Sequence, residues 1–254
     1  MTPAVDLQGA RRSFNAGVTE VQALAGVNLQ IPPGVFAAFL GPSGSGKSTL
    51  LSTVGLLDGL DSGSYRLHGF DVSALTASQR AVVRARAIGF VFQSYFLIPT
   101  RTIERNVELG TLYRGVGRKE RKRRARQAID AVGMTHRIGF RSRTLSGGEK
   151  QRIAIARAII NSPPVLLADE PTGNLDRMTG QLIIDVLTEV NRNGTTLLVA
   201  THDPAVADRA DCVFEMTDGS LTVASGRAAL SSPPTRGEAK ARSDTPPEDC
   251  SAYS

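Results

Sequence analysis

The chain has 254 residues and 41% of them are hydrophobic, enough to bury the core of one large or two small domains. Thirty Lys and Arg against 24 Asp and Glu give a formal net charge of +6, which suits a protein near phosphate or an anionic membrane face but does not single out nucleic acid. The two cysteines, Cys212 and Cys250, lie far apart, which argues against a disulfide framework or a zinc site and fits a reducing compartment.

Residues 1–35 predict short strands joined by turns, with Pro32-Pro33-Gly34 as a strong turn signal. Between a glycine-rich loop at residues 41–48 and residue 140 the chain is expected to be mainly helical, and Thr76 and Gln79 have the spacing of a capping box. The pattern predicts strands at 88–92, 165–168 and 195–200 and helices at 118–132, 149–160 and 178–193. Strands that alternate with helices indicate a parallel sheet with crossover helices.

Membrane and secretion signals are not expected in this chain. Residues 1–15 carry charges and lack an apolar run, so they do not resemble a secretory signal. No segment approaches the ~18 uninterrupted apolar residues of a spanning helix. Any membrane span that the function needs is therefore expected to belong to another chain.

The stretch Gly41-Pro42-Ser43-Gly44-Ser45-Gly46-Lys47-Ser48 matches the phosphate-loop pattern G-x-x-x-x-G-K-[ST] at every fixed position. Its glycines let the backbone curl so that successive N–H groups point at phosphate oxygens, and the helix that follows adds its positive N-terminal end. Lys47 is expected to reach the outer phosphates and the Ser48 hydroxyl to bind Mg²⁺. A buried strand at 35–40 and a helix at 48–54 provide the right context. These loop residues and Thr49 are the predicted nucleotide-binding residues.

The apolar strand at 165–168 ends in two carboxylates, Asp169 and Glu170. At a strand end beside the phosphate loop, Asp169 would hold Mg²⁺ directly or through water. Glu170 points elsewhere and is predicted to polarise the attacking water as general base. The alternative is an ordinary strand that ends in surface acids, which the phosphate loop upstream disfavours.

A second anion site is predicted at Ser146-Gly147-Gly148, where backbone N–H groups and a hydroxyl meet at a helix N-terminus. With one nucleotide site in the chain, the economical explanation is that this loop serves the nucleotide of a partner. At this point the sequence resembles the ATP-binding cassette (ABC) ATPases, and residues 145–152 resemble their signature motif. In that family two subunits pair head to tail, so these three residues would close over ATP held by the other copy.

Four more residues are assigned by the same resemblance. Gln93 is similar to a loop glutamine whose amide reaches Mg²⁺ and the water and whose loop leans on the membrane partner. His202, after the third core strand, resembles the histidine that contacts the γ-phosphate, whereas His68 and His136 are expected to be structural. Asp176 resembles the residue of a dimer-contact loop that faces the opposite phosphate loop. Phe14 resembles the aromatic residue that stacks on adenine, with a plain core position as the alternative.

The resemblance covers about residues 4–223. It implies an α/β P-loop NTPase fold with a RecA-like parallel-sheet core, an N-terminal antiparallel β subdomain and a helical signature subdomain at about 94–160. It also implies a Mg²⁺-dependent ATPase that works as a homodimer with a separately encoded transmembrane permease, peripheral on the cytoplasmic face of the plasma membrane and without a nucleic-acid partner.

Within the family, residues 88–99 and 169–176 most resemble the ATPases of the lipoprotein-releasing and macrolide-exporter group. That likeness favours export or extraction over import. Arg105, Gly110 and residues 141–144 depart from the group's pattern and bear on the identity of the membrane partner rather than on hydrolysis.

Other functions stay open. The same motor would serve a mechanical transmitter in cell-wall remodelling or division, and the sequence does not distinguish this from transport. A soluble cassette acting on DNA or ribosomes is disfavoured because no sustained heptads separate Lys47 from Ser146 and one cassette is present. A P-loop kinase is disfavoured by the signature and Glu170.

Two segments have no assigned role. The basic run at 118–126 is either a patch for nucleic acid or anionic lipid or a solvated helix face, and the absence of interleaved aromatic residues favours the second. Residues 225–254, with two Pro-Pro pairs and many small polar residues, predict a disordered tail.

Overall fold

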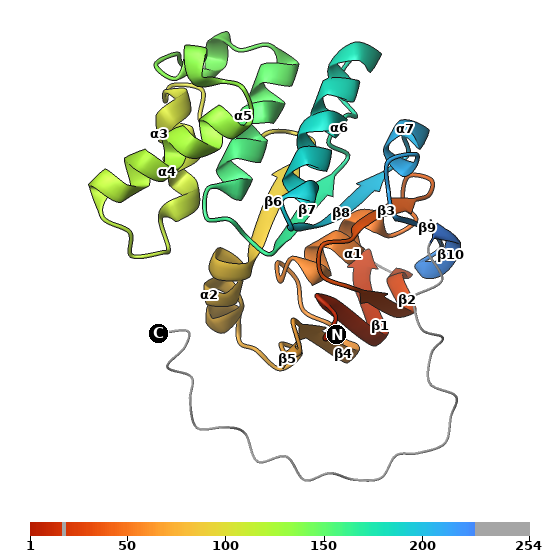
Figure 1. Cartoon of the computed structure of the whole chain (residues 1–254). Coiled ribbons are helices and arrows are strands. Elements are labelled where there is room, and N and C mark those ends of the chain that lie inside the picture. Colours follow the sequence, from red (N-terminus) through yellow and green to blue (C-terminus); the bar gives the residue numbers. More distant parts are fainter. Residues whose placement is uncertain (17–18, 227–254) are drawn as a thin grey trace.

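The computed structural model describes residues 1–16 and 19–226, which form two β-sheets and a group of helices beside them (Figure 1). The strands are β1 (Val5–Ala16), β2 (Thr19–Ile31), β3 (Phe36–Leu40), β4 (Ser62–Leu67), β5 (Phe70–Asp71), β6 (Ile88–Phe92), β7 (Val165–Asp169), β8 (Thr196–Thr201), β9 (Cys212–Thr217) and β10 (Ser220–Gly226). The α-helices are α1 (Lys47–Val54), α2 (Ala77–Ala87), α3 (Ile103–Glu108), α4 (Arg118–Ala131), α5 (Gly147–Ile159), α6 (Arg177–Arg192) and α7 (Pro204–Ala207). Short 3₁₀ turns occur at Leu109–Thr111, Thr135–Arg137 and Ser142–Thr144.

The larger sheet has six strands in the order β10-β9-β3-β8-β7-β6. Strands β9, β3, β8, β7 and β6 are parallel, and β10 pairs antiparallel with β9 at one edge. Alternate residues point into two hydrophobic cores: Leu167 and Leu198 face the core shared with α1 and the smaller sheet, and Leu166 and Leu197 face the core shared with α3 to α6. Burial on both faces explains why these strands are continuous apolar runs in the sequence.

The parallel register aligns the ends of four strands. Leu40 of β3 and Asp169 of β7 lie beside the last two residues of β8, and Phe92 of β6 lies beside Asp169. The predicted site residues that follow these strands therefore emerge from one edge of the sheet. This is the carboxyl edge, where ligands bind in open α/β sheets.

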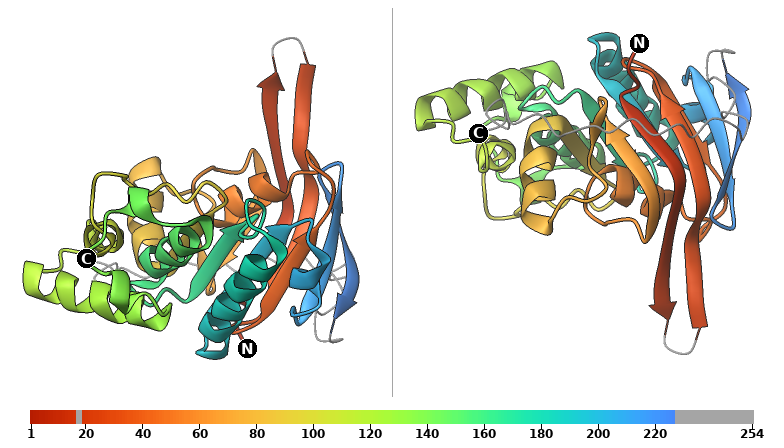
Figure 2. Two further views of the ribbon diagram at one scale, coloured as in Figure 1. Left: turned by 90° about the horizontal axis from the view of Figure 1, so that it is seen from above. Right: turned by 90° about the horizontal axis from the view of Figure 1, so that it is seen from below.

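The smaller sheet is antiparallel, in the order β2-β1-β4-β5. Its strands β1 and β2 are 12 and 13 residues long and project as a hairpin beyond the rest of the molecule (Figure 2). The prediction of short strands before residue 35 is wrong in length, because three register shifts let this ladder bend and continue. The prediction of mainly helix after the phosphate loop misses β4, where only Tyr65 and Leu67 are buried and pairing with β1 defines the strand.

The predictions of helices agree with the structure more closely than the predictions of strands in the first third of the chain. Helix α2 begins with the predicted capping box, in which the Thr76 hydroxyl accepts from the Gln79 N–H and the Gln79 side chain accepts from the Thr76 N–H. Helices α3, α4 and α5 form a group to one side of the larger sheet (Figure 1). The predicted apolar stripe of α4 is buried at Ala125, Ala128 and Ile129.

The basic run on α4 is partly neutralised within the chain. Glu120 lies 2.6 Å from Arg123 and 2.7 Å from Arg124, and Arg126 lies 2.8 Å from Glu104. These contacts agree with the interpretation of the run as a solvated helix face.

Strand β10 ends at Gly226, so Ser225 and Gly226 belong to the sheet and not to the predicted tail. The remainder of that tail, residues 227–254, lies outside the described residues. In the part of the chain that the structure describes, none of the helices is long and apolar enough to cross a membrane.

Candidate active site

The phosphate loop joins the end of β3 to α1 and is packed against neighbouring backbone. A Cβ on Gly41 would lie 2.2 Å from the Met216 carbonyl oxygen, and a Cβ on Gly46 would lie 2.3 Å from the Ala23 carbonyl oxygen. Gly46 caps α1 with a φ of 106°, a left-handed conformation that glycine adopts without strain. The glycines of the motif are therefore required by the curled shape that turns the loop's N–H groups toward an anion.

Lys47, the first residue of α1, points back into this loop. Its side chain is 7% exposed, and its Nζ donates to the carbonyl oxygens of Gly41 and Pro42 at 2.7 and 2.9 Å. An ammonium group has three donors, so one donor and the full charge remain for a phosphate oxygen. The positive end of α1 acts at the same place.

Ser48 and Asp169 meet beside the loop. Ser48 Oγ donates to Asp169 Oδ1 at 3.1 Å. Burial raises the pKa of the Asp169 carboxyl, and this effect exceeds the opposing influence of the Ser48 bond. A buried carboxylate of this kind is stabilised in its charged form by a nearby cation.

The donor set around Asp169 fits Mg²⁺. A hydroxyl, a carboxylate and the Gln93 amide oxygen are hard oxygen donors, and Mg²⁺ is commonly held by one or two carboxylates together with phosphates and water. Among residues 1–16 and 19–226, no group of three or more His, Cys, Asp and Glu side chains could hold a metal. A metal here would therefore depend on oxygens of the nucleotide as well as those of the protein.

Glu170 turns away from Asp169 because its backbone φ is 46°, in the left-handed region. Its N–H donates to the Ala200 carbonyl at 2.9 Å, which fixes the turn to β8. One carboxylate oxygen, Oε2, lies 2.9 Å from His202 Nδ1 and accepts from Thr201 Oγ1 at 3.3 Å. The side chain of His202 is 71% exposed and that of Glu170 only 18%, so the carboxylate is the inner member of the pair. An oriented carboxylate at this depth is suited to accept a proton from water.

Gln93 follows β6 and is tied to Asn174, in the loop between β7 and α6. Its Nε2 donates to Asn174 Oδ1 at 3.4 Å, and Asn174 Nδ2 donates to the Gln93 carbonyl at 3.2 Å. Neither Asn174 nor Thr201 is among the residues predicted from the sequence. Their contacts depend on how separate strand ends meet, and no local pattern signals them.

Phe14 lies on β1, directly across from Val21 on β2. It is 39% exposed, which is not a plain core position. The Arg12 guanidinium lies 4.9 Å from the ring centroid and is itself paired with Asp61 at 2.7 Å. A partly exposed ring held in place by a guanidinium is a suitable stacking surface for a planar base.

One cavity of about 800 Å³ collects these groups. Its lining residues are Phe14, Val21, Ala23, Ser43, Gly44, Gly46, Lys47, Ser48, Thr49, Gln93, Glu170 and His202. All but Val21 and Ala23 are predicted site residues. Those two lie two positions apart on β2, where alternate side chains share one face of the strand, as in any strand. Gly41, Pro42 and Ser45 belong to the same loop without lining the cavity, and Asp169 adjoins it through Ser48.

The residues predicted to act on a partner's nucleotide lie elsewhere: Ser146, Gly147, Gly148 and Asp176 do not line this cavity. Ser146 caps α5 in a capping box with Glu149. Asp176 caps α6 by accepting from the N–H and the hydroxyl of Thr179 at 3.0 and 2.6 Å. These two bonds lower the pKa of the Asp176 carboxyl, and the bond from the hydroxyl has the larger effect.

Glycine at position 148 lets the two capped helices approach. A Cβ on Gly148 would lie 2.2 Å from Thr179 Cγ2, on the first turn of α6. The predicted signature residues and the start of α6 are therefore adjacent to each other, and neither Gly148 nor Asp176 lines the cavity of their own chain.

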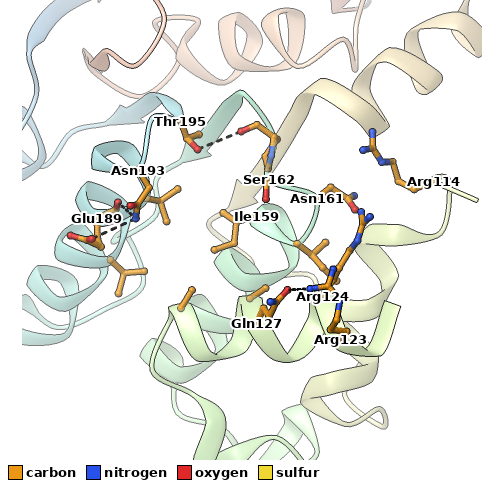
Figure 3. Close-up of a pocket in the computed structure, with 16 residues that line it drawn as sticks. Arg114, Arg123, Arg124, Gln127, Ile159, Asn161, Ser162, Glu189, Asn193 and Thr195 are labelled. Atoms are coloured by element: carbon orange, nitrogen blue, oxygen red, sulfur yellow. Dashed lines mark hydrogen bonds between the residues drawn. The ribbon is translucent and has the colours of Figure 1, made fainter. Parts of the chain in front are cut away.

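A second cavity, of about 620 Å³, lies near the opposite edge of the larger sheet, beside Thr195, the residue before β8 (Figure 3). Arg114, Arg123 and Arg124 line one side of it, and burial together with the charges of Arg124 and Arg86 lowers the pKa of Arg114. None of the predicted site residues lines this cavity. The motif residues other than those predicted to act on a partner's nucleotide thus converge on the cavity at the phosphate loop.

Comparison with known proteins gives close relatives. A family model described as ABC transporter matches residues 24–173. The ABC transporter ATP-binding protein YknY of Bacillus subtilis, described as uncharacterized, is 44% identical over 87% of this chain and 96% of its own length. The macrolide export ATP-binding/permease proteins MacB of Escherichia coli K12 and Marinobacter nauticus are 43% and 45% identical over 87% and 88% of this chain. This chain spans only 34% and 35% of those MacB proteins.

Solved structures give the same picture. A dimeric structure of the bacterial ABC transporter cassette MJ0796 has a TM-score of 0.79 and 36% identity, covering 85% of this chain and 96% of that one. A dimeric post-hydrolysis state of MJ0796 with ADP and Pi has a TM-score of 0.80 and 36% identity over 87% and 99%. The predicted fold and the predicted macrolide-exporter resemblance are both confirmed.

Proposed function

Because this chain belongs to the ABC transporter family, we propose that it is the motor of an exporter or extraction system, working as a head-to-tail homodimer on a separate permease. The chain is an ATPase and the ATP-binding subunit of a transporter. The observation that carries the proposal is the division of the motifs: Lys47, Glu170 and His202 line one cavity, while Ser146 and Gly148 lie outside it.

Within the cavity the residues have separate roles. Lys47 and the loop N–H groups neutralise the outer phosphates, and Phe14 stacks on the adenine. Ser48, Asp169 and Gln93 would hold Mg²⁺, which supplies further charge neutralisation on the phosphates. Glu170 accepts the proton of the attacking water, and His202, bonded to Glu170, lies where it can contact the γ-phosphate.

The signature requires a second copy of the chain. Ser146 and the N-terminus of α5 are suited to bind an anion, and they lie outside the nucleotide cavity of their own chain. A head-to-tail partner would bring Ser146, Gly147 and Gly148 over that nucleotide and Asp176 against its phosphate loop. The dimeric MJ0796 cassettes support this arrangement, since they are similar over most of this chain.

The permease is proposed to seat a segment in a groove of about 680 Å³ between α2, β6 and the helical subdomain. Its walls are largely apolar, and Tyr113 at its border is 86% exposed. The MacB relatives combine ATP-binding and permease parts in one protein, and this chain spans about a third of them. A chain attached in this way would lie on the cytoplasmic face of the plasma membrane.

The experiment that tests the proposal is co-purification. A tagged Glu170→Gln variant, expected to hold ATP without turnover, is extracted from native membranes with ATP and Mg²⁺, and its partners are identified by mass spectrometry. Glu189→Gln, on α6 and outside the nucleotide cavity, is the matched control. A stoichiometric membrane subunit supports the proposal, and soluble or nucleic-acid-bound partners alone contradict it.

A further inference from the structure

The loop that follows Gln93 is anchored by an arginine from the signature helix. Arg157 Nη2 donates to the Tyr95 carbonyl at 2.7 Å, and Nη1 donates to the Phe96 carbonyl at 2.5 Å. Arg157 lies in the last turn of α5, whose first residue is Gly147 of the signature. One guanidinium group therefore connects the signature helix to the loop that carries Gln93.

The two carbonyl groups belong to residues in an uncommon conformation. Tyr95 and Phe96 have φ values of 58° and 46°, in the left-handed region. Aromatic residues rarely adopt this region, and they stay there only when the surroundings impose it. The Phe96 ring packs edge-on against Phe92, but it is 62% exposed, so packing constrains it only in part.

The charge of Arg157 serves no ion pair in the described part of the chain. Burial lowers its pKa, which reflects the cost of placing a guanidinium here without a counter-ion. The planar guanidinium fork donates two bonds with a fixed geometry, which lysine, whose donors all radiate from one nitrogen, does not reproduce. These properties match a requirement for orientation of the loop rather than for simple space filling.

We propose that Arg157 is a positioning residue for the ATPase reaction, which holds the loop after Gln93 so that the Gln93 amide faces the nucleotide cavity. Arg157 also borders the groove proposed for the permease, so a segment seated there would contact the side chain that holds the loop. This inference rests on the proposed role of Gln93 in the cavity.

The first test measures ATPase kinetics of Arg157→Gln and Arg157→Lys. Arg126→Gln is the matched control, because Arg126 also bridges two elements of the helical subdomain, through Glu104, but does not touch the loop. Since misplacing a catalytic group by about 1 Å costs on the order of 100-fold, Arg157→Gln should lower kcat by about 10- to 100-fold. It should also raise the Mg²⁺ concentration for half-maximal activity, while ATP affinity without Mg²⁺ and Tm stay close to the control values. The kcat of Arg157→Lys should lie between those of the wild type and Arg157→Gln, and this variant keeps the test valid if Arg157→Gln does not fold.

A double-mutant comparison with Gln93→Ala distinguishes positioning from support of the fold. If Arg157 acts through Gln93, adding Arg157→Gln to Gln93→Ala lowers kcat no further. If the two losses multiply, the positioning role is overturned while the proposed function stands. If Gln93→Ala alone turns over like the wild type, the proposed role of Gln93 is wrong and this inference falls with it.

Discussion

Among substitutions in the cavity, Glu170→Gln distinguishes ATP hydrolysis from ATP binding most clearly. Glutamine has the same shape, and its amide oxygen can still accept from Thr201 Oγ1 and lie beside His202 Nδ1, where the carboxylate oxygen lies now. The contact with His202, which is 71% exposed, is worth no more than about 1 kcal/mol, so stability should change little. What the variant loses is a group able to take a proton from water.

General-base catalysis contributes about 10²- to 10⁴-fold, so kcat should fall by about that factor. At about 1.36 kcal/mol for each tenfold step, the barrier rises by about 2.7 to 5.4 kcal/mol. ATP affinity should remain within about threefold, because Lys47 and the loop N–H groups are untouched. With ATP present and hydrolysis blocked, the closed dimer should accumulate.

The assays are phosphate release, equilibrium ATP binding and size-exclusion chromatography with and without ATP. Glu189→Gln removes a carboxylate on α6 whose side chain is 63% exposed, and it should match the wild type in all three assays. A Glu170→Gln variant that folds, binds ATP and hydrolyses it at a rate close to wild type would refute the assignment of the general base.

Three further changes have defined outcomes. Lys47→Ala removes charged donors worth about 1.5–3 kcal/mol, so calorimetry should find nucleotide binding weaker by at least about tenfold, and an unchanged affinity would contradict the phosphate-loop assignment. Gly148→Ala places a methyl group 2.2 Å from Thr179 Cγ2, so ATP-driven dimerisation should fall while the nucleotide affinity of the monomer stays the same. Adding Thr179→Ser, which removes the Thr179 methyl group but keeps the hydroxyl bonded to Asp176, should restore dimerisation. Asp169→Asn should raise the Tm of the nucleotide-free protein at neutral pH. The raised pKa of Asp169 means that the folded state binds the proton more tightly than the unfolded state. The ionised carboxylate therefore lowers the stability of the folded state at a pH above its folded pKa. That gain should shrink as the pH falls through the folded pKa and vanish below the ordinary value of 3.8, and a gain independent of pH in calorimetry would show that burial of the charge is not the cause.

The parts of this protein that the sequence by itself determines are local ones. The phosphate loop, the capping box at Thr76 and the apolar strands each depend on residues within a few positions of one another. Backbone conformation and helix capping act over that range, so a pattern of residue types is enough to predict them. Most of the cavity lining follows from the same local motifs.

Only the tertiary structure decided how these pieces meet. The contact of Glu170 with His202, the bonds between Gln93 and Asn174, and the anchor from Arg157 to the Tyr95 carbonyl join segments 32, 81 and 62 positions apart. The length of the β1–β2 hairpin and the existence of β4 likewise depend on pairing between separate strands. Such contacts are selected by strand register and by burial on both faces of a sheet, and these arise only when distant segments pack together.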